Sequence, residues 1–240
     1  MAINVDGLKF LKYCSNEELD FLVQIILAEG SLTESLTGSE LYKKNSPNHK
    51  SYLKLIQEEI ITFGNNTFFN QIAYLFDSPD LQDDYKKILI SVCDKMDVSY
   101  RPSDTVTKIE NQLLGKTFEG AFNSLSDNAK KALIQELGVQ EGSRGKINAA
   151  LFIKLFNKGG FESYKMSVVV ANNVSKVLLG KGLPFVANAT LTKTLSILSS
   201  GPVFWLTTLW GIYDLAGPNY KVIIPAVTYI ACLRKMHPRK

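Results

Sequence analysis

The sequence is poor in the residues that build metal and redox sites: its 240 residues include two histidines and three cysteines. The histidines, His49 and His237, are too few for a multi-histidine metal site. Cys14, Cys93 and Cys232 are odd in number, widely spaced and never form a CxxC pair, which argues against a disulfide framework or a zinc site. Each cysteine falls in an apolar helical pattern, so we predict free buried thiols, a reducing compartment and no tightly bound metal.

Phosphate-binding loops and catalytic pairs are also missing. Leu114-Gly115-Lys116-Thr117 resembles the end of a phosphate loop, but the glycine required five residues before Gly115 is replaced by Glu110. The adjacent acids Glu58-Glu59 and Asp83-Asp84 diverge by about 100° on a helix, so neither pair forms a carboxylate dyad. We therefore predict no cofactor and no enzymatic activity. A hydrolase would need acids distant in the sequence to converge.

The N-terminus lacks the basic region, apolar run and cleavage site of a secretory signal, which predicts a cytoplasmic protein. Composition is 45% hydrophobic and 21% charged, with a mean hydropathy of +0.01. These values are typical of a globular chain and exclude both a disordered chain and a multi-span transporter.

Acidic residues are scarce in the C-terminal part of the chain. Residues 1–140 carry 14 Lys/Arg and 20 Asp/Glu, a net charge of −6, whereas residues 141–240 carry 13 and 3, a net charge of +10. This asymmetry predicts an anionic partner for the basic part: a phospholipid surface, a nucleic acid or the acidic part of the same chain. Nucleic-acid-binding motifs are not visible, so we predict no nucleic-acid partner.

Apolar residues at helical spacing run through residues 1–160, and no clean alternating strand pattern precedes residue 165. Ser15 and Ser126 have the sequence context of helix N-caps, and Ser46-Pro47 predicts a helix that continues to Phe63 and stops at Gly64. His49, in the first turn of that helix, is expected to hydrogen-bond at the surface. We predict an all-α protein with an acidic multi-helix domain at residues 1–140.

Residues 141–240 form the second predicted domain, which is basic and hydrophobic. An apolar helix ends near Gly180, residues 194–213 carry no charge, and residues 222–233 form another uncharged run. Residues 194–213 are long enough to span a bilayer but are diluted by polar residues and interrupted by a Gly-Pro pair. We predict a helical hairpin over residues 168–233, although Pro225 and the β-branched residues after Lys221 also permit a strand.

Cations and aromatic residues flank these uncharged runs, as they do where an apolar segment meets a bilayer interface. The alternatives are a tryptophan-filled core for the aromatic residues and a solvated tail for the final cations. The candidate residues for membrane or client contact are Lys193, Trp205, Trp210, Tyr213, Lys221, Arg234 and Lys235.

Blocks at both ends of the chain resemble the YaaW-like family of bacterial proteins, whose function is uncharacterised. The matching blocks span nearly the whole chain, and they include residues 10–19 (FLKYCSNEEL), residues 220–227 (YKVIIPAV) and residues 230–236 (IACLRKM). The N-terminal helical part is also similar, more distantly, to the ubiquinol–cytochrome c chaperone group, which is all-helical and assists assembly of a membrane respiratory complex. This second resemblance implies an interaction role near membranes and supplies no catalytic residues.

Two functional hypotheses follow. The first is a non-enzymatic, chaperone-like helper protein at or near the cytoplasmic surface of the inner membrane, with a protein partner and anionic lipid as binding partners. The alternative is a membrane-active, pore-forming effector whose hydrophobic hairpin, residues 168–233, inserts into bilayers.

Overall fold

The computed structural model of the chain describes residues 3–28, 34–76, 83–139, 147–183 and 219–238. These residues are helical, with no strand among them, which confirms the all-α prediction. In chain order the elements are η1 (Asp6–Tyr13), α1 (Asn16–Leu27), α2 (Glu34–Gly38), α3 (Glu40–Asn45), η2 (His49–Tyr52), α4 (Leu53–Phe76), α5 (Asp84–Lys95), α6 (Val106–Asn123), α7 (Asp127–Glu136), α8 (Ala149–Lys158), α9 (Gly160–Leu179) and α12 (Tyr220–Met236), where η marks a 3-10 helix.

Several helices begin and end where local sequence signals predict. The Ser15 hydroxyl accepts a hydrogen bond from the Glu18 amide, and the Glu18 carboxylate accepts one from the Ser15 amide, which completes a capping box for α1. Ser126 caps α7 in the predicted way. Gly138 and Gly180 follow α7 and α9 with positive φ angles of 66° and 67°, a conformation that glycine adopts without strain.

The helix predicted from Ser46 to Phe63 is wrong at both ends. Ser46 follows the end of α3, and α4 begins only at Leu53, after the short helix η2. Gly64 lies inside α4, where the Ile88 side chain of α5 packs so closely that a Cβ on Gly64 would lie 2.5 Å from its Cδ1 atom. The close packing of α4 against α5 therefore explains why position 64 is a glycine, although the glycine does not end the helix.

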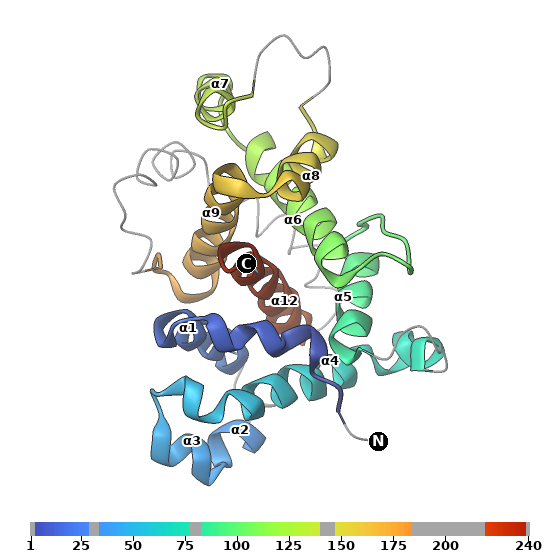
Figure 1. Ribbon diagram of the computed structural model, residues 1–240, viewed down its shortest axis with the longest axis vertical. Coiled ribbons are helices and arrows are strands. Elements are labelled where there is room, and N and C mark those ends of the chain that lie inside the picture. The colour runs from blue at the N-terminus through green and yellow to red at the C-terminus, as the bar shows by residue number, and fades with distance from the viewer. Residues whose placement is uncertain (1–2, 29–33, 77–82, 140–146, 184–218, 239–240) are drawn as a thin grey trace.

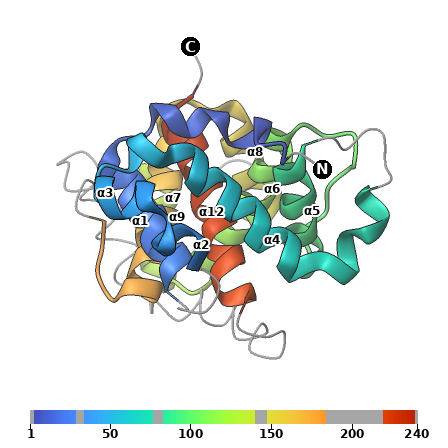
Figure 2. The same ribbon diagram turned by 90° about the horizontal axis from the view of Figure 1, so that it is seen from below.

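Helix α12 lies in the middle of the fold. Figures 1 and 2 show it in red, surrounded by the other helices, and it contacts η1, α1, α4, α5, α6 and α9. Tyr220 and every residue from Val222 to Leu233 are buried. A helix that is apolar on all sides is expected at such a position. This segment is therefore a helix that contains Pro225, and the strand that its sequence also permitted does not form.

Apolar side chains from both predicted domains join in one core. Phe21 of α1 stacks edge-on against Tyr229 of α12 at 4.6 Å between ring centroids, and Phe118 of α6 lies 4.8 Å from Phe152 of α8. Helix α9 also packs along α12. The boundary at residue 140 remains a prediction, while the core itself is shared across it.

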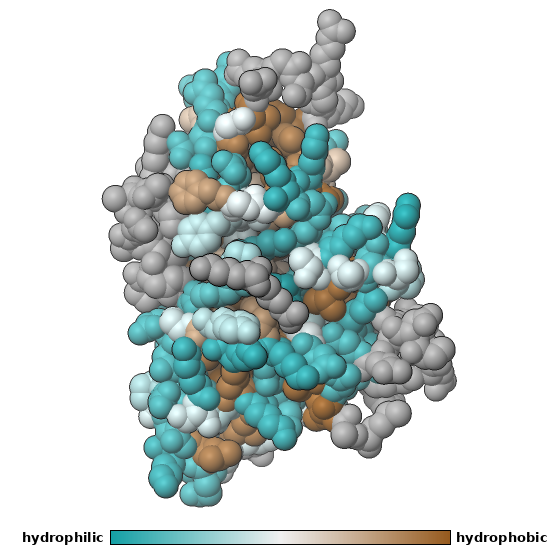
Figure 3. Space-filling model, viewed as in Figure 1, coloured by the Kyte–Doolittle hydropathy of each residue, from teal (hydrophilic) through white to brown (hydrophobic). Residues whose placement is uncertain are grey.

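Within the described segments, no helix is both long and apolar enough to cross a bilayer. The uncharged run 194–213 lies outside those segments. Figure 3 shows a largely hydrophilic face on which hydrophobic residues form several separate patches.

Candidate functional site at the junction of the chain ends

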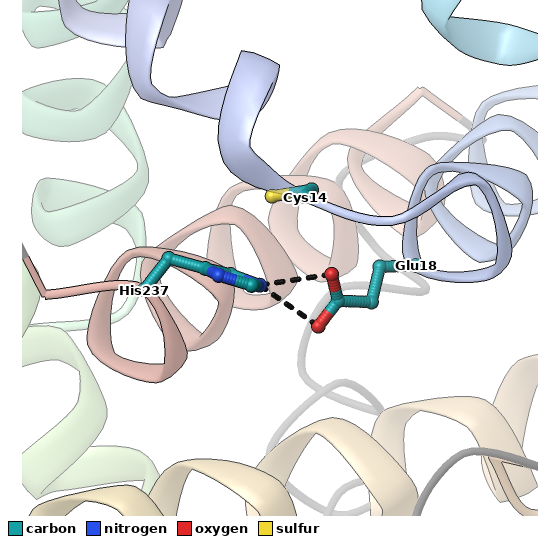
Figure 4. Close-up of side chains that lie close together, drawn as sticks. All are labelled: Cys14, Glu18 and His237. Carbon is teal, nitrogen blue, oxygen red and sulfur yellow. Dashed lines mark hydrogen bonds and ion pairs between the residues drawn. The ribbon is translucent and has the colours of Figure 1, made fainter.

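Residues near the two ends of the chain meet beside the N-terminus of α1. His237, directly after α12, places its Nε2 atom 2.8 and 2.9 Å from the two carboxylate oxygens of Glu18 (Figure 4). The same carboxylate accepts the Ser15 amide at 2.7 Å. The capping box thus orients Glu18 toward a histidine that is 219 residues away in the sequence.

The thiol of Cys14 lies against this pair. Its Sγ atom, one Glu18 oxygen and one His237 ring nitrogen all lie within 4.8 Å of one another. Cys14 is buried, and this burial together with the charge of Glu18 raises the pKa of its thiol to about 12. In the absence of a bound cation, the thiol is therefore neutral at physiological pH.

A buried ion pair lies near this cluster. Arg234 of α12 donates from Nε to a carboxylate oxygen of Glu110 at 2.6 Å, and Tyr85 donates to the other oxygen at 2.8 Å. Arg234 also donates to the carbonyl of Gly7 and lies over the ring of Phe10. Burial alone lowers the pKa of Arg234, but the facing Glu110 carboxylate outweighs it and the net pKa is raised.

A cleft of about 770 Å³ opens above these groups, bounded by η1, the loop before α6, the first turn of α9 and the end of α12. Its lining includes the apolar side chains of Phe10, Val106, Phe161, Tyr164 and Met236. Arg234, Lys235 and His237 also line it, as do Asp6 and Asp83. The cleft therefore combines an apolar lining with charged groups of both signs, as ligand-binding clefts commonly do.

Aromatic rings stand at the α9 side of the cleft. The rings of Phe161 and Tyr164 are stacked at 6.2 Å with an interplanar angle of 15°, and Phe161 is 48% exposed. Lys165 Nζ lies 5.1 Å from the Phe161 ring centroid and donates to the Glu136 carbonyl of α7. Ser163, buried at the cleft wall, has a hydroxyl oxygen without a hydrogen-bond partner among the described residues. This side of the cleft can contact an apolar group and offers one buried hydroxyl.

The other histidine is buried, contrary to the sequence-based expectation of a surface role. His49 Nε2 lies 3.0 Å from Asp20 Oδ1, and its Nδ1 lies 2.6 Å from the Tyr52 hydroxyl. A smaller hollow of about 440 Å³ includes Asp20 and Pro47 in its lining. The hydrogen-bonded side chains of Asp20, His49 and Tyr52 connect α1 to η2. They include no serine, threonine or cysteine that the imidazole could activate.

The structure separates the seven residues predicted for membrane or client contact. Lys193, Trp205, Trp210 and Tyr213 lie outside the described residues. Lys221 is exposed at the start of α12.

Two of the seven, Arg234 and Lys235, point inward and line the cleft, and their contact with a membrane or a client stays a prediction. Arg234 pairs with Glu110, and Lys235 is half-buried, with its Nζ 3.3 Å from the carbonyl oxygen of Phe156. The desolvation of Lys235 lowers its pKa. The final cations of α12 are therefore used within the fold, which is the intramolecular alternative raised by the charge asymmetry.

Sequence reasoning missed the convergence at the chain ends. Cys14 and Glu18 are four residues apart, which gives a weak local signal, but nothing in the spacing places His237 beside them. The resemblance to one family gave no such signal either, because its C-terminal block, residues 230–236, ends before His237.

Curated relatives cover almost the whole chain. A UPF0174 protein of Helicobacter pylori (strain J99) is 37% identical over 243 residues, which is 98% of this chain and 93% of that protein. A second UPF0174 protein from the same strain is 34% identical over 85% of this chain and 98% of its own length. The UPF0174 protein YaaW of Escherichia coli (strain K12) is 25% identical over 98% of this chain and 95% of its own. No family model and no solved structure matches the chain.

Proposed function

The chain belongs to the UPF0174 family, and we propose that it is a non-enzymatic helper protein that binds apolar segments of a partner protein at the cytoplasmic surface of the membrane. The family confirms the YaaW-like resemblance of the terminal blocks. The binding element of this proposal is the cleft between α9 and the end of α12.

The single observation that carries the proposal is the exposed aromatic pair beside the cleft. Phe161 leaves almost half of its surface in water, although a phenylalanine of a globular protein is usually buried. Its ring stacks on Tyr164, which lines the same cleft. An apolar side chain of a client that enters the cleft would remove this aromatic surface from water, which is favourable.

The charged groups of the cleft support binding rather than chemistry. Arg234 is neutralised by Glu110 and His237 faces Glu18, so these acids and bases are already paired within the protein. General acid–base catalysis needs a group that reaches the substrate and exchanges a proton with it. The described residues of this cleft thus favour a structural use of their charges.

The location at the membrane has separate support. Residues 141–240 carry a net charge of +10, and Lys221 is exposed at the start of α12. Anionic lipid attracts such cations by about 1 kcal/mol each near the surface. Because Arg234 and Lys235 point inward, this part of the proposal rests on them less than the sequence indicated.

The packing of α12 weighs against the pore-forming alternative. Insertion of residues 168–233 would remove the central helix from its contacts with η1, α1, α4, α5 and α6. It would also break the Arg234–Glu110 pair and leave the fully buried Glu110 without its partner, which is costly. The helper hypothesis needs no such rearrangement.

Suppression of client aggregation tests the proposal. We expect the purified protein to reduce light scattering by heat-aggregating citrate synthase, and Phe161→Ala to lose most of this effect because the variant removes the exposed ring. Leu41→Ala is the matched control, since Leu41 is 55% exposed on α3, away from the cleft. Equal suppression by both variants, or none by the wild type, contradicts the proposed role of the cleft.

A further inference from the structure

The cluster formed by Cys14, Glu18 and His237 brings together three side chains that are common ligands of transition metals. It contains a sulfur, a carboxylate oxygen and an imidazole nitrogen within 4.8 Å of one another (Figure 4). We propose that these three residues form a binding site for a divalent cation of the zinc type. The inference does not depend on the proposed helper function.

Zinc accepts this mixed ligand set. It binds thiolate sulfur at about 2.3 Å and imidazole nitrogen or carboxylate oxygen at about 2.0–2.2 Å, in tetrahedral geometry. Bonds of these lengths place ligand atoms roughly 3.3–3.8 Å apart. The present His237–Glu18 distance of 2.8 Å must therefore open by about 1 Å or less, and the thiol, now within 4.8 Å of both atoms, must approach by about 1.5 Å or less. Side-chain rotation provides shifts of this size without moving a helix.

Hydrogen bonds already fix the backbone of Cys14 and His237 and the carboxylate of Glu18. The amide of Cys14 bonds to the Leu11 carbonyl at 3.0 Å, and the amide of His237 bonds to the Leu233 carbonyl at 2.9 Å. The Glu18 carboxylate accepts the Ser15 amide, an outer hydrogen bond of the kind that orients metal ligands. These contacts reduce the conformational entropy that is lost when the site closes around an ion.

Access and charge both suit a cation. His237 lines the cleft and its side chain is 27% exposed, so an ion can enter from the cleft while Cys14 stays buried. When the ion binds, the thiol loses its proton to solvent and its sulfur becomes a thiolate. One thiolate, one carboxylate and a neutral imidazole around a divalent ion give a site without net charge. Water from the cleft supplies the fourth ligand.

This inference differs from the sequence-based expectation of no bound metal. That expectation rested on the number of histidines and the absence of CxxC spacing, which are signals of sites built from local motifs. A site that uses one cysteine, one glutamate and one histidine from opposite chain ends has no such motif. Only the packing of α12 against α1 brings these residues together.

Cobalt titration of the purified full-length protein tests the site. We expect one Co²⁺ per chain, a thiolate-to-cobalt charge-transfer band, competition by Zn²⁺, and a rise in melting temperature with bound metal. Cys14→Ala should abolish the charge-transfer band. His237→Gln should weaken binding by more than about 10-fold, because even the outer hydrogen-bond partners of metal ligands are worth about 10- to 100-fold in affinity.

Three further variants make the test specific. Cys93→Ala and His49→Gln remove a cysteine and a histidine outside the cluster, so both should bind Co²⁺ like the wild type. Glu18→Gln keeps a side chain that can complete the capping box but removes the anionic ligand, so it should weaken binding while α1 remains intact.

The melting temperature in chelator checks folding of each variant, and His237→Gln carries the test if Cys14→Ala fails to fold. The inference is overturned if the wild type shows no charge-transfer band, or if His237→Gln binds Co²⁺ as tightly as His49→Gln.

Discussion

Arg234 and Glu110, 124 residues apart in the sequence, form an ion pair of 2.6 Å between α12 and α6. Glu110 is completely buried, and its second oxygen accepts the Tyr85 hydroxyl. Arg234 also donates to the Gly7 carbonyl of η1. One guanidinium therefore links the last helix of the chain to the first element and to the middle of the sequence.

We expect Arg234→Gln to destabilise the protein by about 3–5 kcal/mol, because it leaves a buried carboxylate without its counter-charge. Tyr85→Phe should cost less, about 1.5–3 kcal/mol, since it removes one hydrogen bond to the charged carboxylate and leaves the ion pair. Urea unfolding followed by circular dichroism measures both changes. Lys44→Gln, at an exposed position of α3, is the control and should stay within about 0.5 kcal/mol of the wild type. A loss below about 1 kcal/mol for Arg234→Gln contradicts a buried pair in solution.

The sequence predicted those features of the fold that depend on neighbours in the chain. Ser15 and Ser126 cap helices because a hydroxyl needs only an amide three residues away. Gly180 ends α9 because it adopts a positive φ angle. The burial of all three cysteines, predicted from their apolar helical context, is also confirmed.

Features set by distant contacts were not predictable in this way. Gly64 continues a helix because Ile88 fills the space beside it, and His49 is buried because Asp20 and Tyr52 bond to its ring. The cluster at Cys14 needs His237, whose position depends on the whole fold. The charge asymmetry along the sequence predicted that basic residues after position 140 could pair with acidic residues before it. The same asymmetry also predicted attraction to anionic lipid, and the sequence alone did not distinguish the two.

Gly115 offers a test of helix packing at a motif that resembles a phosphate loop. It lies inside α6, where a Cβ would lie 2.9 Å from the backbone nitrogen of Ile153 in α8. Gly115→Ala must therefore push two helices apart, and we expect a loss of about 1–3 kcal/mol in unfolding free energy despite the better helix propensity of alanine. Gly38→Ala, with no atom within 4 Å of the new Cβ, is the control. If Gly115→Ala is as stable as the control, this helix crossing is looser than described.

Thiol reactivity provides a second test of the core. Cys14, Cys93 and Cys232 are all buried, and burial raises the pKa of each thiol. Because the thiolate is the reactive form, we expect Ellman's reagent to modify none of them rapidly in the native protein at neutral pH. All three should react after unfolding in guanidinium chloride. Rapid reaction of one thiol in the native state, identified by mass spectrometry, indicates an opening at that position.

The last prediction separates membrane attraction from internal pairing. Lys221 is exposed, and Lys193 flanks the uncharged run 194–213, so the double variant Lys193→Gln/Lys221→Gln should weaken binding to anionic vesicles. At about 1 kcal/mol per cation, the expected loss is roughly 30-fold. The variant Lys43→Gln/Lys44→Gln removes the same charge from exposed positions in α3 and should bind almost as the wild type.

Flotation with phosphatidylglycerol–phosphatidylethanolamine vesicles at low and high salt measures these affinities, because screening weakens attraction between exposed charges. Equal losses for the two double variants indicate a response to net charge alone, without a defined lipid-binding surface. Absence of wild-type binding at low salt contradicts the membrane location. The helper function at the cleft would then stand alone, with the excess positive charge after residue 140 partly explained by contacts such as Arg234–Glu110 and Lys165–Glu136.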